Sequence, residues 1–333
     1  MLTLKEIQGQ AYLIHHLKQA LATGQVHHAY LFYGPNGVGK RTTAVALAAA
    51  LNCLKPQNGD ACGQCSSCLS TAGGNHPDFY QVDPQGKNIK IDQIRQLQEG
   101  LSYKHWQGNY KVALINDADL MTEEAANSLL KILEEPGERT CFVLTTSRPQ
   151  SLLPTILSRC QKYSFRPLGP EEIQRVLEQQ GVAASQAEVF ARLSNGSLGR
   201  ALAMVADDTF LEQRQKAHRL CERLMTGGIT DCFEIADELN REEPERLLEL
   251  MANWWRDVLV WQLSGTETLL VNVDLIERIK GQSLPVESLK SALWQLEQAR
   301  QWLGYNANRR LCLEVMALQI NQHFSGRKGG SGW

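Results

Sequence analysis

Residues 31–42 read Leu-Phe-Tyr-Gly-Pro-Asn-Gly-Val-Gly-Lys-Arg-Thr, and they lie between a short apolar run and a segment with helical periodicity. Gly34, Gly39 and Lys40 match the phosphate-loop pattern G-x-x-x-x-G-K-[ST] at every position but the last. Glycines let backbone N–H groups surround phosphates, and the following helix turns its positive end toward them. The stretch predicts a loop for ATP or ADP, formed by Gly34, Pro35, Asn36, Gly37, Val38, Gly39, Lys40, Arg41 and Thr42.

The last position of this loop departs from the pattern. Arg41 stands where a Ser or Thr would hold Mg²⁺, and Thr42 carries its hydroxyl one residue later, about 100° further around a helix. Lys40 can still reach the β- and γ-phosphate oxygens. The loop therefore predicts nucleotide binding and leaves the role of Mg²⁺ open.

Composition bounds the class of protein. The chain of 333 residues is long enough for two or three domains, and it is 43% hydrophobic and 21% charged with a formal net charge of −2. This balance excludes a generally basic nucleic-acid wrapper. The longest apolar runs fall short of the roughly 20 residues that span a bilayer, and the N-terminal residues do not resemble a signal peptide. Nine cysteines, an odd number, beside a phosphate loop indicate a reducing cytoplasm.

Four cysteines lie in one short segment after the helix expected at 40–52: Cys53, Cys62, Cys65 and Cys68. They predict a zinc module at about 53–76. Two overlapping C-x₂-C steps bring three thiolates together, and Cys53 can supply a fourth. Four thiolates around Zn²⁺ form a closed tetrahedral site, which is structural because no position is left for water. The alternatives are an iron–sulfur cluster, whose usual x₃-C-P continuation is missing, His76 as a ligand in place of Cys53, and four unrelated cysteines.

Apolar runs alternate with helical segments as far as residue 165. We expect strands at 28–33, 79–82, 110–119, 140–147 and 161–165, and helices at 4–23, 40–52, 91–101, 122–135 and 153–159. Thr122 is the expected N-cap of the fourth helix. This alternation predicts an α/β fold with a doubly wound parallel sheet and a ligand at the carboxyl ends of its strands.

The strand expected at 110–119 ends in Asn116 and Asp117. In nucleotide hydrolases the corresponding residues are Asp, which supports Mg²⁺, and Glu, which polarises the attacking water. An amide is a poor support for Mg²⁺, and Asp117 is one methylene shorter than Glu. Asp117 is therefore a weak candidate for the catalytic acid, and Asp119 is the other acid that could replace the missing one.

Prolines and a glycine at 167–170 mark a boundary, beyond which we expect helices. Residues 170–206 suit three short helices, with Gly196 and Gly199 between the second and third. Longer helices follow to about 323. They carry five tryptophans, which are typical of a core, with a subunit interface as the alternative for part of them: Trp254, Trp255, Trp261, Trp294 and Trp302. The expected domains are 1–166, a lid at 167–207, a helical oligomerisation domain at 208–324 and a flexible tail at 325–333.

Several of these motifs together resemble the clamp-loader branch of the AAA+ ATPases, which serves bacterial DNA polymerase III. The likeness runs from about residue 7 to 320, and it is carried by 27–32, the loop at 34–40, the cysteines with 76–78, 125–136, 158–160 and 306–311. The resemblance implies an AAA+ module with an inserted zinc knuckle, a small helical lid, and an all-α collar that joins five subunits into an open ring.

The resemblance also implies roles for single residues. The Ser-Arg-Cys motif places an arginine finger at Arg159, which acts in trans on the γ-phosphate held by a neighbouring subunit. A lid arginine is implied after Gly-Ser-Leu, where this chain has Gly199, with Arg200 one place late. Together with Arg41 and Asn116, this departure predicts a stator whose own ATPase activity is weak or absent and which helps to load the sliding clamp onto primed DNA.

The implied partners are the gamma/tau and delta subunits of a heteropentameric ring and, through the ring, the sliding clamp and primer–template DNA. We expect no polymerase chemistry and no membrane contact. The alternative is an ATP-hydrolysing motor subunit of gamma/tau type, which the nearly intact loop favours and residues 41 and 116 oppose. A third possibility is a free-standing zinc-containing protein that binds nucleic acid. Such a protein would need a basic, aromatic-lined surface, and the net charge of −2 does not indicate one.

Overall fold

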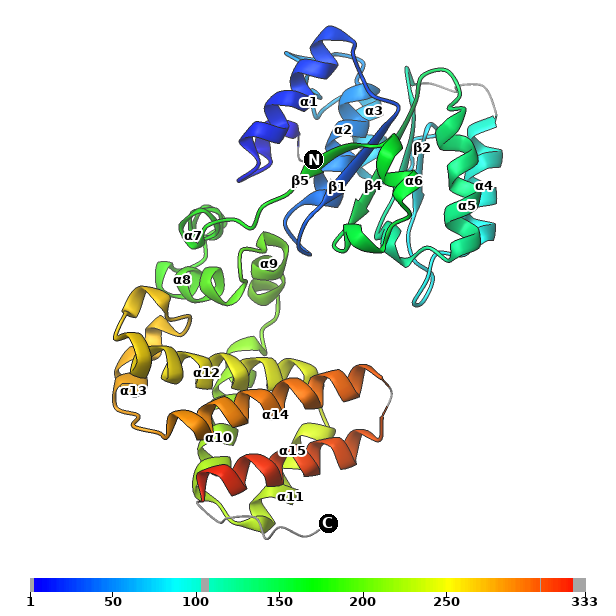
Figure 1. The fold of residues 1–333 in the computed structure, drawn as a ribbon. Helices are drawn as coiled ribbons and strands as arrows, with labels where there is room; N and C mark the ends of the chain where they lie inside the picture. The colour runs from blue at the N-terminus through cyan, green and yellow to red at the C-terminus, as the bar shows by residue number, and fades with distance from the viewer. Residues whose placement is uncertain (1–2, 103–107, 306, 326–333) are drawn as a thin grey trace. The chain divides into compact units, whose positions relative to one another are not determined.

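The structure is a computed structural model that describes residues 3–102, 108–305 and 307–325 (Figure 1). The chain divides into two compact units. The first unit comprises Met1–Val176 with Ser194–Arg200, and the second comprises Leu177–Leu193 with Ala201–Trp333. The four-part division expected from the sequence stays a prediction, and residue 306 and the tail beyond Ser325 lie outside the described residues.

A five-stranded parallel sheet forms the centre of the first unit, in the order β2-β3-β4-β1-β5 (Figure 1). β1 lies between β4 and β5, so that Tyr33 at its end is level with Thr146 and Ser164. The predicted parallel sheet is therefore confirmed. Its strands are β1 (Ala29–Tyr33), β2 (Phe79–Val82), β3 (Lys111–Ile115), β4 (Thr140–Thr146) and β5 (Gln161–Ser164).

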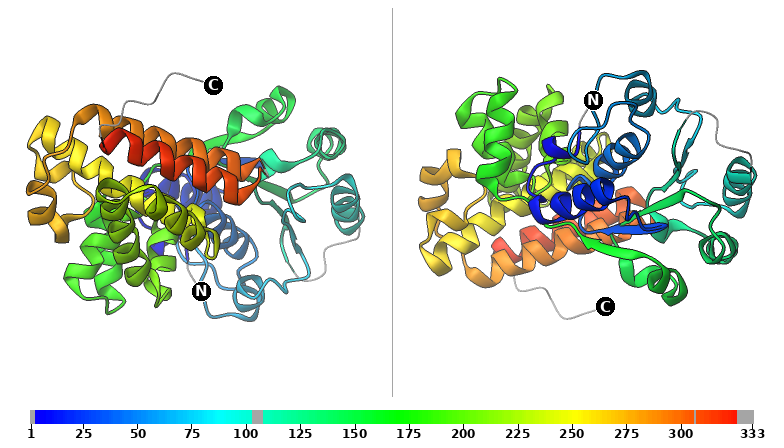
Figure 2. Two further views of the ribbon diagram at one scale, coloured as in Figure 1. Left: turned by 90° about the horizontal axis from the view of Figure 1, so that it is seen from below. Right: turned by 90° about the horizontal axis from the view of Figure 1, so that it is seen from above.

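Helices cover both faces of the sheet, as Figures 1 and 2 show. On one face Tyr30 and Phe32 of β1 share a core with α1 (Ala11–Thr23), α2 (Lys40–Leu51) and α3 (Ser66–Ala72). On the other, Ala29 and Leu31 share a core with α4 (Ile91–Ser102), α5 (Glu123–Glu134) and α6 (Pro154–Arg159). Because successive side chains of a strand point to opposite faces, burial on both faces requires the continuous apolar runs seen in the sequence.

Most predicted elements are present with bounds shifted by a residue or two, and Thr122 caps α5 as expected, its Oγ1 accepting from the Ala125 N–H at 3.3 Å. The single helix expected at 4–23 is wrong. A short 3₁₀ turn, η1 (Leu4–Glu6), precedes α1, because Gly9 adopts a left-handed φ of +70°. A Cβ at Gly9 would lie 2.7 Å from Leu168 Cγ, so the chain must bend there with glycine.

The third strand is shorter than expected. β3 ends at Ile115, and the polar residues that follow it form a turn that leads into η2 (Ala118–Leu120). Asp117 in this turn has a left-handed φ of +45°, a conformation that Asp and Asn tolerate better than most residues. Asn116 and Asp117 therefore stand at the carboxyl edge of the sheet, beside the loop that leaves β1.

Three short helices follow the sheet, as expected: α7 (Pro170–Gln179), α8 (Ala184–Leu193) and α9 (Leu198–Ala206). Gly196 precedes α9 with a φ of +81°, and a Cβ there would meet Pro167 at 2.4 Å. The expectation that Gly199 also lies between two helices is wrong. Gly199 is in the first turn of α9, because the chain already turns at Gly196.

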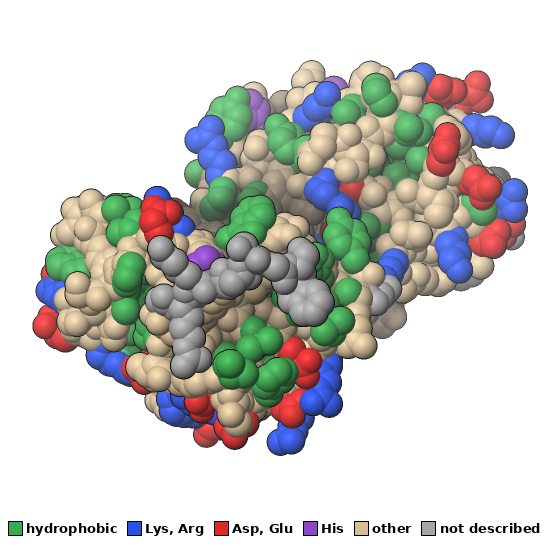
Figure 3. All heavy atoms as spheres, turned by 60° about the horizontal axis from the view of Figure 1, so that its bottom comes forward, with side chains coloured by type: hydrophobic (Ala, Val, Ile, Leu, Met, Phe, Trp, Pro, Cys, Tyr) green, Lys and Arg blue, Asp and Glu red, His purple; other side chains and the backbone are tan. Residues whose placement is uncertain are grey.

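The second unit is helical throughout the residues that the structure describes. Its longer elements are α10 (Phe210–Thr226), α11 (Ile229–Asn240), α12 (Pro244–Ser264), α13 (Ile276–Lys280), α14 (Val286–Gly304) and α15 (Arg309–Phe324), with the 3₁₀ turns η4 (Glu267–Leu269) and η5 (Val273–Leu275). Trp254 and Trp255 are buried in its core, whereas Trp294 is 62% exposed. Figure 3 shows hydrophobic side chains exposed among charged ones.

A buried carboxylate holds the connection between α12 and α13. Asp257 is fully buried, and its Oδ2 accepts hydrogen bonds from the backbone N–H of Asn272 at 2.7 Å and from the side-chain amide of Asn272 at 2.8 Å. The N–H of Val271 also donates to this carboxylate, at 3.0 Å. Within the described part of the chain, no helix is long and apolar enough to cross a membrane.

Candidate functional site

The loop between β1 and α2 has the backbone conformation that its glycines predict. Gly34, Gly37 and Gly39 all have positive φ, at 149°, 75° and 97°. At Gly34 a Cβ would lie 2.3 Å from the carbonyl oxygen of Phe165, so a larger residue cannot replace it without moving β5. α2 begins directly after Gly39, and its first turn therefore points unpaired N–H groups at the space the loop encloses.

Lys40 is the one cationic side chain of the loop that is buried, with 7% of its surface exposed. Its Nζ donates to the carbonyl oxygens of Gly34 and Pro35, both at 2.7 Å. Burial lowers the pKa of Lys40, and the nearby carboxylates of Asp117 and Asp119 act in the opposite direction. The loop's own carbonyls thus hold the ammonium group where a phosphate oxygen would be bound.

The start of α9 and the residue before it, Ser197, touch this loop within the first unit. The Gly199 N–H donates to the carbonyl oxygen of Gly37 at 3.0 Å, and a Cβ at Gly37 would lie 2.0 Å from Ser197 Oγ. A Cβ at Gly199 would be 3.3 Å from Gly37, tighter than most real contacts. The close approach explains why glycine stands at 199, the place where the clamp-loader resemblance implies an arginine.

Asn116 is buried at the end of β3 and is hydrogen-bonded through both ends of its amide. Its Nδ2 donates to Asp83 Oδ1 at 2.7 Å, and its Oδ1 accepts from Thr145 Oγ1 at 3.4 Å. The Asp117 N–H in turn donates to Thr145 Oγ1 at 3.1 Å. The neighbouring strands β2, β3 and β4 thus share one polar network at the carboxyl edge of the sheet.

Arg41 points from the first turn of α2 toward the same network. Its Nη2 lies 3.6 Å from Asp83 Oδ2, and the two side chains are 60% and 46% exposed. Gln81 also donates to this carboxylate. Asp83 therefore contacts both Arg41, which departs from the phosphate-loop pattern, and Asn116, which stands where hydrolases have Asp; the sequence did not predict this role. Its only local signal is an acid placed directly after a strand.

Asp119, one of the two acids considered as a replacement, is engaged elsewhere. Its Oδ1 accepts from Thr146 Oγ1 at 2.6 Å, and its Oδ2 accepts from Arg148 Nε at 2.9 Å. The ion pair with Arg148 leaves this carboxylate little capacity to bind a metal or orient a water molecule. Asp117 is the acid of this edge that remains beside Lys40.

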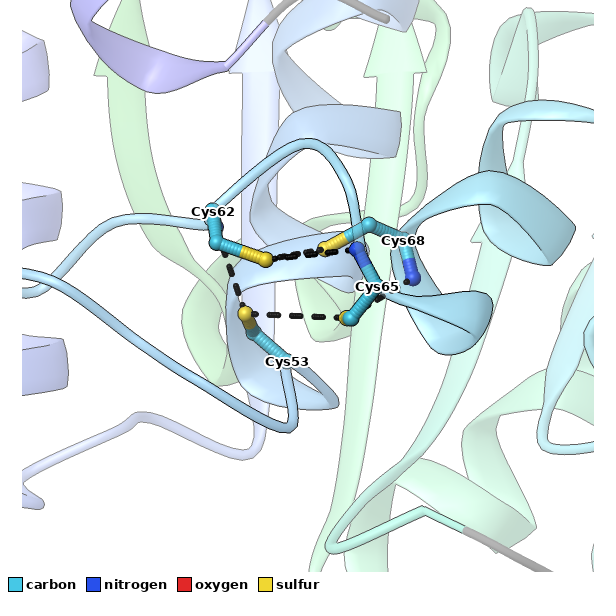
Figure 4. A group of neighbouring side chains, drawn as sticks. All are labelled: Cys53, Cys62, Cys65 and Cys68. Carbon is cyan, nitrogen blue, oxygen red and sulfur yellow. Dashed lines mark hydrogen bonds between the residues drawn. The ribbon is translucent and has the colours of Figure 1, made fainter.

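The four cysteines of the predicted module meet in one cluster, shown in Figure 4, with all their sulfur atoms within 4.8 Å of one another. The Cys53–Cys65 and Cys62–Cys68 sulfur pairs are each 4.0 Å apart. Four thiolates at the usual Zn–S distance of about 2.3 Å from one ion would be about 3.8 Å from each other. The spacing of the sulfur atoms therefore fits a tetrahedral metal site.

Backbone N–H groups point at the sulfur atoms and favour their ionised form. The N–H groups of Gln64 and Cys65 lower the pKa of Cys62 to about 6, and the Cys65 N–H lies 3.4 Å from that sulfur. His76 is not in the cluster. Its Nδ1 accepts from the Asp78 N–H at 3.1 Å, which is a local turn contact, so the alternative with His76 as a ligand is not supported.

The cysteine module is fastened to the N-terminal residues through Asp60. Its Oδ1 accepts from the Leu4 N–H at 3.0 Å, and its Oδ2 accepts from the Lys5 N–H at 2.9 Å. Lys18 of α1 forms an ion pair with the same carboxylate at 2.9 Å. One buried acid therefore ties the start of the chain, α1 and the module together.

Comparison with known proteins identifies the family. The family model described as "DNA polymerase III, delta subunit" matches residues 9–169, and its C-terminal counterpart matches residues 210–322. The DNA polymerase III subunit delta' of Bacillus subtilis is 35% identical, over 92% of this chain and 94% of the relative. The chain belongs to the delta' family of DNA polymerase III.

Two other relatives, a delta' subunit and a tau subunit, allow the two predicted subunit types to be compared. The delta' subunit of Escherichia coli is 32% identical, with 90% of each chain covered. The tau subunit of Bacillus subtilis is 28% identical, and this chain spans only 61% of it. The resemblance to the bacterial clamp-loader branch predicted from the motifs is confirmed, with delta' subunits as the better-covered relatives and the gamma/tau alternative as the weaker match.

The predicted finger of this delta' family member is partly exposed at the end of a short helix. Arg159 is the last residue of α6, and its Nη1 donates to the Thr155 carbonyl oxygen at 2.9 Å. Its Nη2 forms an ion pair with Glu134 Oε1 at 2.6 Å, and a third of the arginine side chain is exposed. Two contacts thus hold the guanidinium in one orientation while leaving part of it open to a partner.

Proposed function

We propose that this chain is the stator of a clamp loader, which completes the ATPase site of a neighbouring subunit and turns over little or no ATP itself. Membership of the delta' family supports its place in the loader. The observation that carries the stator role concerns the two positions that would hold Mg²⁺: Asn116 donates to Asp83 at 2.7 Å, and Arg41 lies 3.6 Å from the same carboxylate.

Arg159 is the residue that serves the neighbour. A guanidinium is permanently charged and planar, and it stabilises the charge that spreads over the phosphoryl oxygens in the transition state. Its two contacts, to Thr155 and Glu134, come from the same unit and fix the direction of the group before a partner arrives. The proposed partners are gamma/tau and delta subunits in a five-membered ring, and the ring acts on the sliding clamp and primer–template DNA.

The chain's own loop holds ATP or ADP in this proposal. The positive φ values of its three glycines and the start of α2 supply backbone N–H groups for the phosphates, and Lys40 supplies a charge. The bound nucleotide stabilises the contact between Gly37 and Gly199 in the first turn of α9, and this contact keeps the subunit in one conformation.

A structural Zn²⁺ is held by Cys53, Cys62, Cys65 and Cys68 in this proposal. The 4.0 Å sulfur separations and the inward-pointing N–H groups fit a closed tetrahedral site, which supplies folding energy and no chemistry. Because Asp60 ties the module to Leu4 and Lys18, the metal fixes one end of the first unit.

Subunit contacts are proposed on the second unit. Trp294 of α14, Tyr305 directly after it and Leu311 of α15 are exposed, at 62%, 83% and 57%. Aromatic and apolar side chains at such positions are enriched in protein–protein interfaces. We expect neighbouring subunits to cover these three side chains when the helical domains pack into a collar.

The test is DNA-stimulated ATP turnover by the reconstituted loader. Arg159→Ala should remove a large share of turnover, because an arginine finger contributes roughly 10³–10⁵ in rate at the site it serves. Lys40→Ala should remove little, and Arg95→Ala, at an exposed arginine of α4, controls for loss of a surface charge. A damaging Lys40→Ala with a mild Arg159→Ala would establish the motor alternative instead.

A further inference from the structure

Two positions beside a Mg²⁺ ion depart from the usual nucleotide-hydrolase residues, one at the end of the phosphate loop and one at the end of β3. The hydroxyl that would bind the ion is replaced by Arg41, and the acid that would support it is replaced by Asn116. In the structure the two replacements meet on one carboxylate, since Asp83 lies 3.6 Å from Arg41 and 2.7 Å from Asn116.

Of the three acids at this edge, Asp83 and Asp119 are already engaged, which leaves Asp117 as too small a set of oxygen ligands for Mg²⁺. Asp83 already accepts from Asn116 and Gln81 and faces Arg41, and Asp119 is ion-paired with Arg148. Mg²⁺ requires oxygen ligands in nearly ideal octahedral geometry and dehydrates reluctantly, so it does not displace a guanidinium from a carboxylate easily. The positive charge of Arg41, 3.6 Å from Asp83, would also repel the ion.

The same arrangement suits the phosphates of a nucleotide without a metal. Arg41 follows Lys40 directly, so both cations leave the first turn of α2, whose N–H groups face the phosphates. The guanidinium is 60% exposed, and its 3.6 Å contact with Asp83 is longer than a hydrogen bond, so it can turn to an oxygen within reach. Guanidinium groups bind phosphate oxygens through two parallel N–H bonds.

We propose that the loop binds a nucleoside di- or triphosphate without a divalent metal, and that Arg41, oriented by Asp83, supplies the positive charge that Mg²⁺ would otherwise bring. The inference rests on the nucleotide binding proposed above and states its chemical form. A nucleotide held in this way lacks the ion that phosphoryl transfer normally uses, so it serves as a structural ligand and is not hydrolysed there.

The test is equilibrium binding of ATP and of ADP to the purified full chain, in excess MgCl₂ and in excess EDTA. The wild-type dissociation constants in the two buffers should agree within about twofold, because no coordination bond is gained. Arg41→Thr should weaken binding in EDTA by about tenfold, the loss of one charge-assisted hydrogen bond. Arg41→Thr combined with Asn116→Asp should bind tightly again only when Mg²⁺ is present.

Arg95→Thr is the matched control, because Arg95 is an exposed arginine on α4 that pairs with Asp92. Wild-type binding that disappears in EDTA, or Arg41→Thr binding that is unchanged there, would overturn the inference. So would a wild-type chain that binds neither nucleotide in either buffer. The stator role is decided separately by Arg159→Ala in the ring, and a loader that depends on Arg159 keeps that role whatever the loop binds.

Discussion

Arg159 and Glu134 form an ion pair of 2.6 Å that joins the last residue of α6 to the last residue of α5. The two helices cover the same face of the sheet, and the pair joins their C-terminal ends. Both side chains are partly exposed, so the pair contributes at most about 1 kcal/mol to folding. We expect its main role to be orienting the guanidinium group of Arg159 rather than stabilising the fold.

Glu134→Ala should therefore lower the part of ring turnover that depends on Arg159 by up to about tenfold, since a catalytic group that is loosely held spends less time in the productive geometry. Thermal unfolding should hardly change. Glu135→Ala removes the next carboxylate along the chain and serves as the control, with turnover kept. Equal turnover for Glu134→Ala and wild type would show that the partner subunit alone orients Arg159.

Zinc should be present at about one ion per chain, and Cys68→Ser should lose it. The melting temperature of the first unit should then fall by several degrees, because each kcal/mol lost shifts it by about 2–4 °C in units of about 150–250 residues. Metal analysis and calorimetry check both points. Cys232→Ser, at a buried cysteine of α11 far along the sequence, should keep the ion. A full zinc complement in Cys68→Ser would contradict the four-cysteine site.

His218 should make the second unit less stable in acid. Burial, with Arg214 and Arg278 adding to it and Asp274 opposing it, lowers the pKa of this imidazole to about 3, against an unfolded value of about 6.5. Between these values the unfolded chain binds the extra proton, so stability is complete above about pH 6.5 and falls as the pH drops toward 3.

Urea unfolding at about pH 7 and about pH 5 measures the effect. The wild-type chain should lose roughly 2 kcal/mol between the two, at up to about 1.4 kcal/mol per pH unit below 6.5, and His218→Phe should lose much less. Phenylalanine keeps the ring contact with Trp254, whose centroid is 4.6 Å from that of His218. Identical losses in both proteins would show that His218 is protonated while folded.

Asp257→Ala should cost about 3–5 kcal/mol of unfolding free energy, because the buried donors of Val271 and Asn272 lose their acceptor. Glu277→Ala provides the comparison: this carboxylate is exposed and pairs with Lys280, so its loss should change stability by less than about 0.5 kcal/mol. Denaturant titration of both variants distinguishes the buried acid from the surface one.

Features encoded over short stretches were predictable. The bounds of β2, the cap at Thr122 and the cluster of four cysteines follow from local periodicity, capping preference and ligand spacing. The break at Gly9 was missed, because a glycine inside a helical pattern shows its reason only when Leu168 packs against it. The position of Gly199 depends in the same way on its contact with Gly37.

The role of Asp83 could not have been predicted, because it depends on strand order. Asp83 follows β2, Asn116 follows β3 and Arg41 follows the loop after β1, so the three are separated in sequence and meet only at the edge of the folded sheet. Hydrophobic periodicity and amino-acid composition predict each strand separately. They do not say which strand ends will be neighbours.

The fastening of Leu4, Lys5 and Lys18 by Asp60 has a consequence for how the chain is made. A ribosome releases the first helix well before it releases the cysteines, so the N-terminal residues emerge without the carboxylate that receives their N–H groups. These N–H groups meet their acceptor only when residues 53–68 have left the exit tunnel and folded, which the proposed Zn²⁺ would assist. Supply of the metal during synthesis would then decide how long this end of the nascent chain stays open to proteases and chaperones.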